Sequence, residues 1–187
     1  MPLPHAGRYL SDMARPRLSP EKWLNAGMEA LVAAGPSALA AEPLARRLGT
    51  TKGSFYWHFK DVPAFQDAVL QEWRGKALGH VVALLQERGE ADQRLRKFGR
   101  DVLNDGVEAN LRIWANGDTR VRSVLEEVDA ERLRYLTQLL AGLGLGNPDF
   151  ARALQASLIG LPQIAQSASD DGIAPFDTLV DTILALA

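Results

Sequence analysis

The segment from residue 49 to residue 60, Gly-Thr-Thr-Lys-Gly-Ser-Phe-Tyr-Trp-His-Phe-Lys, gathers hydrogen-bond donors and flat rings in a short stretch. Thr50 or Thr51 can cap a helix here by accepting a bond from a free backbone N–H. Phe55 and Phe59 lie four residues apart, so both point to one side of the helix and can anchor it to a core. The opposite side carries Lys52, Ser54, Tyr56, Trp57 and His58, and Lys60 follows. Such a helix is suited to face an anionic partner.

The preceding residues, 41 to 48, predict a two-turn helix with Leu44 and Ala45 facing inward and two arginines facing outward. Pro43 fits in its first turn, where a missing N–H does no harm. Gly49 ends it, as glycine does just past a helix end. A helix, a short turn and a second helix form the helix-turn-helix layout, whose second helix enters the DNA major groove.

Catalysis is the main alternative interpretation of the same residues. Ser54, His58 and Asp61 could be read as a triad, but nothing nearby predicts an oxyanion hole. The three histidines have no metal-ligand spacing, and the chain contains no cysteine and no glycine-rich phosphate loop after a strand. We therefore expect no enzyme activity, no metal and no cofactor.

The chain resembles transcriptional regulators of the TetR/AcrR type over residues 20 to about 75. The residues that carry the resemblance are Gly35, Leu44-Ala45-Arg46-Arg47-Leu48-Gly49, Lys52-Gly53-Ser54-Phe55-Tyr56-Trp57-His58-Phe59 and Val62-Pro63-Ala64-Phe65. Segments 111–115, 118–122 and 128–132 are similar to the regulatory domain of one subgroup. The resemblance implies an all-helical homodimer that binds double-stranded DNA and a small-molecule effector.

By this resemblance the DNA-facing residues are Thr51, Lys52, Gly53, Ser54, Tyr56, Trp57 and His58, and Lys60 is expected to contact phosphate. The sequence departs from the family at two places. Ala40 and Ala41 stand where the family usually has threonine or serine, and Val62 stands where it often has lysine. Both changes remove phosphate donors, so contacts from elsewhere are an open alternative.

Charge is divided unevenly over the 187 residues, whose net charge is −2. Residues 1–80 carry a net charge of +3 and residues 81–187 a net charge of −5. Because salt screens phosphate attraction beyond roughly 10 Å, the local charge matters more than the total. No apolar run is long enough for a membrane span, and the start has no signal-peptide core, so we expect a cytoplasmic protein.

Helical periodicity predicts an all-α protein of about nine helices. Three domains follow: residues 1–18 as a flexible basic arm, 19–65 as the helix-turn-helix domain, and 66–187 as the effector-binding and dimerisation domain. Met13 is an alternative start of the protein. The expected helices span about 20–34, 41–48, 52–60, 62–88, 91–103, 107–115, 119–141, 149–167 and 175–187.

The last two helices carry apolar stripes that either pack inside the domain or, by the resemblance, form a four-helix dimer interface. The expected interface residues are Phe150, Leu154, Leu158, Leu161, Phe176, Leu179 and Ile183.

The resemblance places an effector pocket among the helices of the second domain. Its expected lining is Trp73, Phe98, Val102, Leu111, Trp114, Tyr135, Leu139 and Gln163. Few charges are expected in the interior, which favours a largely apolar effector.

The sequence thus predicts a ligand-responsive, dimeric DNA-binding regulator, most simply a repressor released from a palindromic operator by its effector. The alternative is a DNA-binding adaptor whose second domain binds a protein partner. The sequence identifies neither effector, operator nor target genes.

Overall fold

The protein is all-helical in a computed structural model that describes residues 18–164 and 172–186. The helices number nine in these ranges, as the sequence predicts, with one short 3-10 turn. They are α1 (Pro20–Ala34), η1 (Pro36–Ala38), α2 (Ala41–Arg47), α3 (Lys52–Tyr56), α4 (Val62–Gln86), α5 (Ala91–Leu103), α6 (Gly106–Ala115), α7 (Thr119–Gly142), α8 (Pro148–Ile164) and α9 (Ile173–Leu184). The predicted basic arm, apart from Leu18, and the predicted helix end near residue 167 lie outside the described residues.

Several helix boundaries differ from the predicted ones, and the backbone conformation explains two of the differences. Helix α4 ends at Gln86 because Glu87 adopts an extended conformation and Gly89 has a φ of +147°. Helix α9 begins at Ile173, after Gly172 with its left-handed φ of +71°. Pro175 therefore lies in the first turn, where proline is tolerated.

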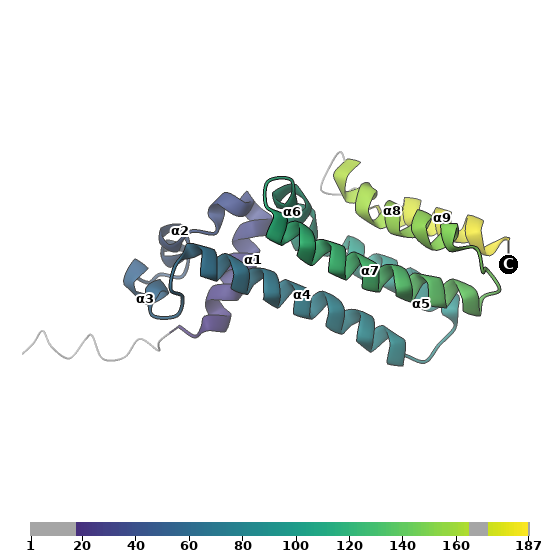
Figure 1. Cartoon of the computed structure of the whole chain (residues 1–187), viewed down its shortest axis with the longest axis horizontal. Coiled ribbons are helices and arrows are strands. Elements are labelled where there is room, and N and C mark those ends of the chain that lie inside the picture. Colours follow the sequence, from purple (N-terminus) through teal and green to yellow (C-terminus); the bar gives the residue numbers. More distant parts are fainter. Residues whose placement is uncertain (1–17, 165–171, 187) are drawn as a thin grey trace, which may run out of the picture.

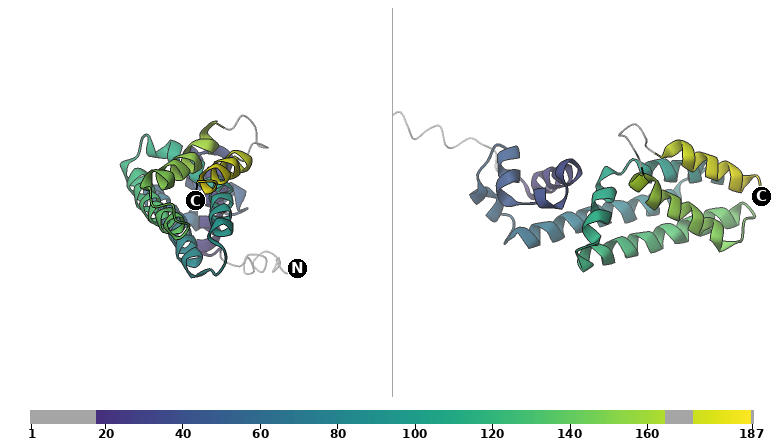
Figure 2. Two further views of the ribbon diagram at one scale, coloured as in Figure 1. Left: turned by 90° about the vertical axis from the view of Figure 1, so that its right-hand side faces the viewer. Right: turned by 90° about the horizontal axis from the view of Figure 1, so that it is seen from above.

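The molecule is elongated, and α4 joins its two ends (Figure 1). Helices α1 to α3 cluster at one end, where α4 begins, and α4 then runs to the opposite end. Helix α7 lies beside α4, while α8 and α9 pack together on the side of α7 away from α4 (Figures 1 and 2). The C-terminal end lies far from α3.

Two hydrophobic cores fill the molecule. The first unites α1, α2, α3 and the first half of α4 with residues of α6 and α7. The second unites the end of α4 with α5, α8, α9 and the rest of α7. The predicted domain boundary at residue 65 falls inside the first core and stays a prediction.

An aromatic cluster forms the centre of the first core. The Phe55 ring lies 5.4 Å from that of Trp23 and 5.2 Å from that of Phe65, and Phe59 lies 4.8 Å from Phe65, measured between ring centroids. Gly27 of α1 makes room for Phe65, because a Cβ at this glycine would lie 2.7 Å from Phe65 Cζ. The predicted anchoring of α3 by two phenylalanines is thus confirmed.

Replacing Phe59 by alanine tests the anchoring. Phe59 is buried, so Phe59→Ala should lower the free energy of unfolding by about 3–5 kcal/mol through the lost contacts and the cavity. Trp57→Ala is the matched control, since Trp57 is 84% exposed and its loss should change stability by less than about 1 kcal/mol. Urea unfolding followed by circular dichroism gives both values. Equal effects of the two substitutions would contradict the anchoring role of Phe59.

Candidate DNA-binding surface and interhelical groove

Helix α3 is short and begins with a side-chain cap. The Thr51 hydroxyl accepts a hydrogen bond from the Ser54 backbone N–H at 3.3 Å, as the sequence predicts for a threonine here. The regular helix ends at Tyr56, but the Phe59 N–H still donates to the Phe55 carbonyl at 3.0 Å. The helical turn therefore continues far enough to bring both phenylalanines to the same side.

The outward side of this segment is well exposed. Trp57 is 84% and Tyr56 46% exposed, although large aromatic side chains are usually covered. Thr51, Lys52, Gly53 and Lys60 are exposed, while Ser54 and His58 are half-buried. The structure thus brings all eight predicted DNA-contact residues together on and beside one helix.

Packing against the described residues does not require glycine at position 53. Its φ is not positive, and a Cβ here would meet only the Thr51 hydroxyl oxygen, at an ordinary 3.6 Å. Since alanine would also favour the helix, glycine costs about 0.5–1 kcal/mol here. The glycine leaves the backbone of this exposed helix open to close approach.

The hypothetical triad has another explanation in the structure. Asp61 is the N-cap of α4, where its carboxylate accepts a hydrogen bond from the Ala64 N–H at 2.8 Å.

Within residues 18–164 and 172–186 no group of three His, Asp or Glu side chains could hold a metal ion. No helix in the same ranges is long and apolar enough to cross a membrane.

The two departures from the family have different structural settings. Ala40 is the N-cap of α2 and makes no side-chain cap bond, whereas Val62 packs partly against the first core. Arg47 pairs with Glu29 at 2.9 Å, while Arg46 has no carboxylate partner among the described residues.

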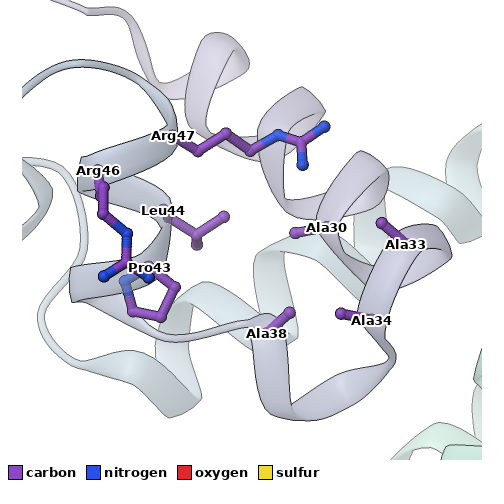
Figure 3. A pocket seen from close by; sticks show the side chains of 8 residues that line it. All are labelled: Ala30, Ala33, Ala34, Ala38, Pro43, Leu44, Arg46 and Arg47. Carbon is purple, nitrogen blue, oxygen red and sulfur yellow. The ribbon is translucent and has the colours of Figure 1, made fainter.

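A hollow of about 280 Å³ lies between α1, η1 and α2 (Figure 3). Four of its eight lining residues are alanines, Leu44 points from α2 toward Ala30, and Arg46 and Arg47 flank it. This hollow belongs to the helix-turn-helix end of the molecule, so it is not where the sequence places an effector pocket.

A groove of about 400 Å³ lies where α1, α4, α5, α6 and α7 meet. Two predicted pocket residues, Trp73 and Val102, line it. The full lining is Met28, Trp73, Lys76, Ala77, His80, Asp101, Val102, Asp105, Val107 and Arg132. We call it the junction groove, because Met28 belongs to α1 of the helix-turn-helix end.

Hydrogen bonds in the junction groove tie its helices together. Asp105 accepts the indole N–H of Trp73 at 2.8 Å with one carboxylate oxygen, and the Val107 backbone N–H at 3.0 Å with the other. It therefore caps α6 and attaches it to α4. His80 and Asp101 are joined at 2.9 Å between α4 and α5.

Buried charges next to this groove join α6 to α7. Glu108 and Arg132, 5% and 4% exposed, bond through Glu108 Oε2 and Arg132 Nη1 at 2.6 Å. Arg112 bonds Glu108 Oε1 at 2.6 Å and Asp129 at 2.7 Å. Burial alone would lower the pKa of Arg112, but the hydrogen bond to Asp129 and both carboxylate charges raise it. Glu108 and Arg132 are the only buried charged residues among those described, which agrees with the expectation of few charges in the interior, and they pair with each other where α6 packs on α7.

The other predicted pocket residues lie elsewhere. Phe98, Leu111, Tyr135 and Leu139 are buried in the two cores, and Trp114 is half-buried against the first. Gln163 is exposed at a depression of about 370 Å³ that Arg112 and Asp129 also line. Sequence reasoning missed Asp105 and Arg132 of the junction groove. The only signal in the sequence was that Arg132 is the last residue of segment 128–132, which is similar to the regulatory domain of one TetR/AcrR subgroup.

The predicted interface residues divide into two groups. Leu154, Leu158, Phe176 and Ile183 are buried inside the protomer, whereas Phe150, Leu161 and Leu179 are half-buried against the second core. Phe176 fills the space at Gly99 of α5, where a Cβ would lie 2.0 Å from the ring. The buried four are thus unavailable to a second protomer in this structure. The exposed side of the two helices carries Ala153, Ala156, Ile164, Ala174, Thr178 and Leu186.

Comparisons with known proteins agree with this geometry. Residues 24–61 match the model described as "Bacterial regulatory proteins, tetR family". No curated protein matches the sequence. A transcriptional regulator from Rhodococcus has a similar solved structure, with 18% identity, a TM-score of 0.76, and coverage of 91% of this chain and 98% of that one.

Two further solved structures share the fold. SmeT, the repressor of a multidrug efflux pump of Stenotrophomonas maltophilia, has 17% identity and a TM-score of 0.65, covering 91% of this chain and 90% of its own. FadR from Bacillus subtilis in complex with stearoyl-CoA has 15% identity and a TM-score of 0.62, covering 89% and 98%. Residues 24–61 are thus similar to tetR-family regulatory proteins, and the chain shares its all-helical fold with these solved transcriptional regulators.

Proposed function

We propose that this regulator is a ligand-responsive homodimer, and most simply a repressor, that leaves a palindromic operator when a small effector binds. The observation that carries the proposal is the exposed, core-anchored α3 segment with Tyr56 and Trp57 on its surface. Two copies related by a twofold axis would read half-sites one helical turn apart.

The α3 segment offers both kinds of DNA contact. Lys52 and Ser54 lie in the first turn, the part of a recognition helix that reaches base edges, and Gly53 lets the backbone approach. Tyr56 and Lys60 carry donors suited to phosphate, which positions the protein without reading sequence. The indole of Trp57 offers an apolar face to sugar or to a thymine methyl group.

A second protomer is proposed to cover the exposed side of α8 and α9. Ala153, Ala156 and Gly160 follow one side of α8, and a Cβ at Gly160 would meet nothing within 4 Å inside the protomer. Small side chains let two helices approach closely. Ile164 and Leu186, 72% and 65% exposed, would then be covered at the ends of this surface.

The effector is proposed to bind in the junction groove and to act through α6. The groove holds apolar side chains such as Trp73 and Val102 for the body of the ligand, and Lys76 and Arg132 for a polar group. Asp105 and the buried charges hold α6, and α6 contacts α1 of the helix-turn-helix end. A ligand preferring one position of α6 about 100-fold would shift the equilibrium by about 2.7 kcal/mol.

A DNA-binding adaptor remains the second candidate. The absence of phosphate donors at Ala40 and Val62 favours weak or unusual DNA use. The two functions differ in what occupies the second domain, so binding of a small molecule to the junction groove decides between them.

Two substitutions on α3 test DNA binding. Lys52→Ala and Tyr56→Phe should each weaken operator binding by roughly 1–3 kcal/mol without loss of fold, because each removes one exposed donor. The operator is first isolated by selecting bound genomic fragments, and affinity is then measured by fluorescence anisotropy. Arg134→Ala on α7, another exposed cation, is the matched control and should leave affinity unchanged. If it weakens binding as much as Lys52→Ala, α3 is not the specific contact.

A filled junction groove tests effector binding. Compounds that raise the melting temperature of the wild-type protein should weaken operator binding about tenfold or more. Ala77→Leu should abolish both effects while operator affinity without compound changes less than about threefold, because the added atoms occupy the groove. Ala83→Leu, at an exposed position of the same helix, is the control and should respond like the wild type. A full response in Ala77→Leu would place the effector elsewhere.

A charge on α8 tests dimerisation. Gly160→Arg should convert a dimer into a folded monomer, because the new guanidinium would be buried without a partner at the interface. Sedimentation velocity measures the mass, and circular dichroism checks the fold. Gln71→Arg, on the exposed side of α4, should stay dimeric. A wild-type protein that sediments as a monomer would rule out the proposed assembly.

A further inference from the structure

A second groove lies at the corner between α4 and α5, at the end of the molecule remote from α3 (Figure 1). It has a volume of about 360 Å³, within the range of small-molecule sites. Five of its eight lining residues are cationic. The lining is Glu87, Arg88, Gly89, Gln93, Arg94, Arg96, Lys97 and Arg100. We call it the corner groove.

Ion pairing neutralises some of these charges but not all. Lys97 Nζ donates to both carboxylate oxygens of Glu87, at 2.9 and 2.8 Å, and this bond raises the pKa of Lys97. Arg96 bonds Asp181 and lies 3.5 Å from Asp177. The only acidic residue of the groove is therefore already occupied.

Three arginines of the corner groove lack any carboxylate partner. Most arginines in the described part of the chain pair with Asp or Glu, and the exceptions are Arg46, Arg88, Arg94, Arg100 and Arg122. Three of these five lie on one groove, although the surrounding half of the chain carries a net negative charge. A concentration of unpaired guanidinium groups in an acidic region needs a cause other than overall charge.

The base of the groove is held in place. Arg94 donates from Nη2 to the Leu84 carbonyl at 2.8 Å, and its guanidinium carbon lies 5.9 Å from the centre of the Tyr135 ring. Its Nε is buried and has no acceptor. Helix α5 also begins here, and its N-cap residue Glu90 makes no side-chain cap bond, which leaves the N–H groups of the first turn free. An anion in the groove would meet positive charge from these guanidinium groups and from the start of the helix.

We propose that the corner groove binds the di- or triphosphate group of a soluble small molecule. The planar fork of arginine matches phosphate oxygens in pairs, and several guanidinium groups on one groove suit a polyphosphate, with its several negative charges, better than a single carboxylate. The groove lies at the opposite end of α4 from α3, so it is not part of the proposed DNA-binding surface (Figure 1). It is also separate from the junction groove, so the proposal does not depend on the identity of the effector.

The double substitution Arg88→Gln with Arg100→Gln tests the proposal. Both side chains are exposed and unpaired, so the variant should fold normally, which its melting temperature checks. In calorimetry with pyrophosphate, the wild type should bind, and the double variant should bind at least tenfold more weakly. Arg134→Gln with Arg152→Gln removes the same charge elsewhere and should bind pyrophosphate within about twofold of the wild type.

Three results would overturn the proposal. One is the absence of binding heat with pyrophosphate and the wild type at low salt. Another is equal weakening in both double variants, which indicates unspecific attraction. The third is binding only to vesicles containing phosphatidylglycerol, which indicates a lipid surface as the source of phosphate. Operator affinity of the variant Arg88→Gln with Arg100→Gln separates this site from the proposed function, since this variant should not change it.

Discussion

The contact between α3 and the aromatic cluster behind it is the interaction on which the proposed DNA recognition depends. A helix of five residues is far too short to be stable alone, because nucleation costs more than a few hydrogen bonds return. Burial of Phe55 against Trp23 and Phe65 supplies the missing stability. The exposed Trp57 is therefore held in position by the side chains beneath it rather than by the helix itself.

The same cluster makes α3 sensitive to events elsewhere in the molecule. Phe65 belongs to α4, whose first turn is capped by Asp61, so the direction of α4 and the position of α3 are fixed together. Helix α6 is tied to α4 through Asp105 and to α7 through Glu108. Breaking a buried ion pair by removing one partner costs about 3–5 kcal/mol, so these ties favour a few discrete arrangements over continuous bending. An arrangement of this kind is what a population shift requires.

Local signals in the sequence predict much of this architecture. The cap at Thr51, the four-residue spacing of Phe55 and Phe59 and the break at Gly49 each depend on neighbouring residues, so they can be read without a fold. The residues that cover an apolar stripe cannot be identified in this way, because they are distant in the sequence. The pattern around Phe176 says that one side of the helix is buried, but only the packing of α9 on α5, with Gly99 at the contact, says that the covering surface lies within the protomer. Glu108 and Arg132 are charged and therefore predict exposure, and their pairing appears only when α6 meets α7.

The net charge of a sequence range is also a poor guide to where anions bind. The net charge of residues 81–187 is negative, which by itself predicts a surface that repels anions. Most arginines in this range pair with carboxylates. Arg88 and Arg100 of the corner groove do not. Because screening confines electrostatic attraction to roughly 10 Å, a ligand responds to those unmatched groups and not to the sum. Arg46 in α2, at the other end of the molecule, also has no carboxylate partner among the described residues, and it belongs to a helix-turn-helix without the phosphate donors typical of the family that it resembles. The arginines that the fold leaves without a carboxylate are therefore better guides to anion binding than the net charge of the chain.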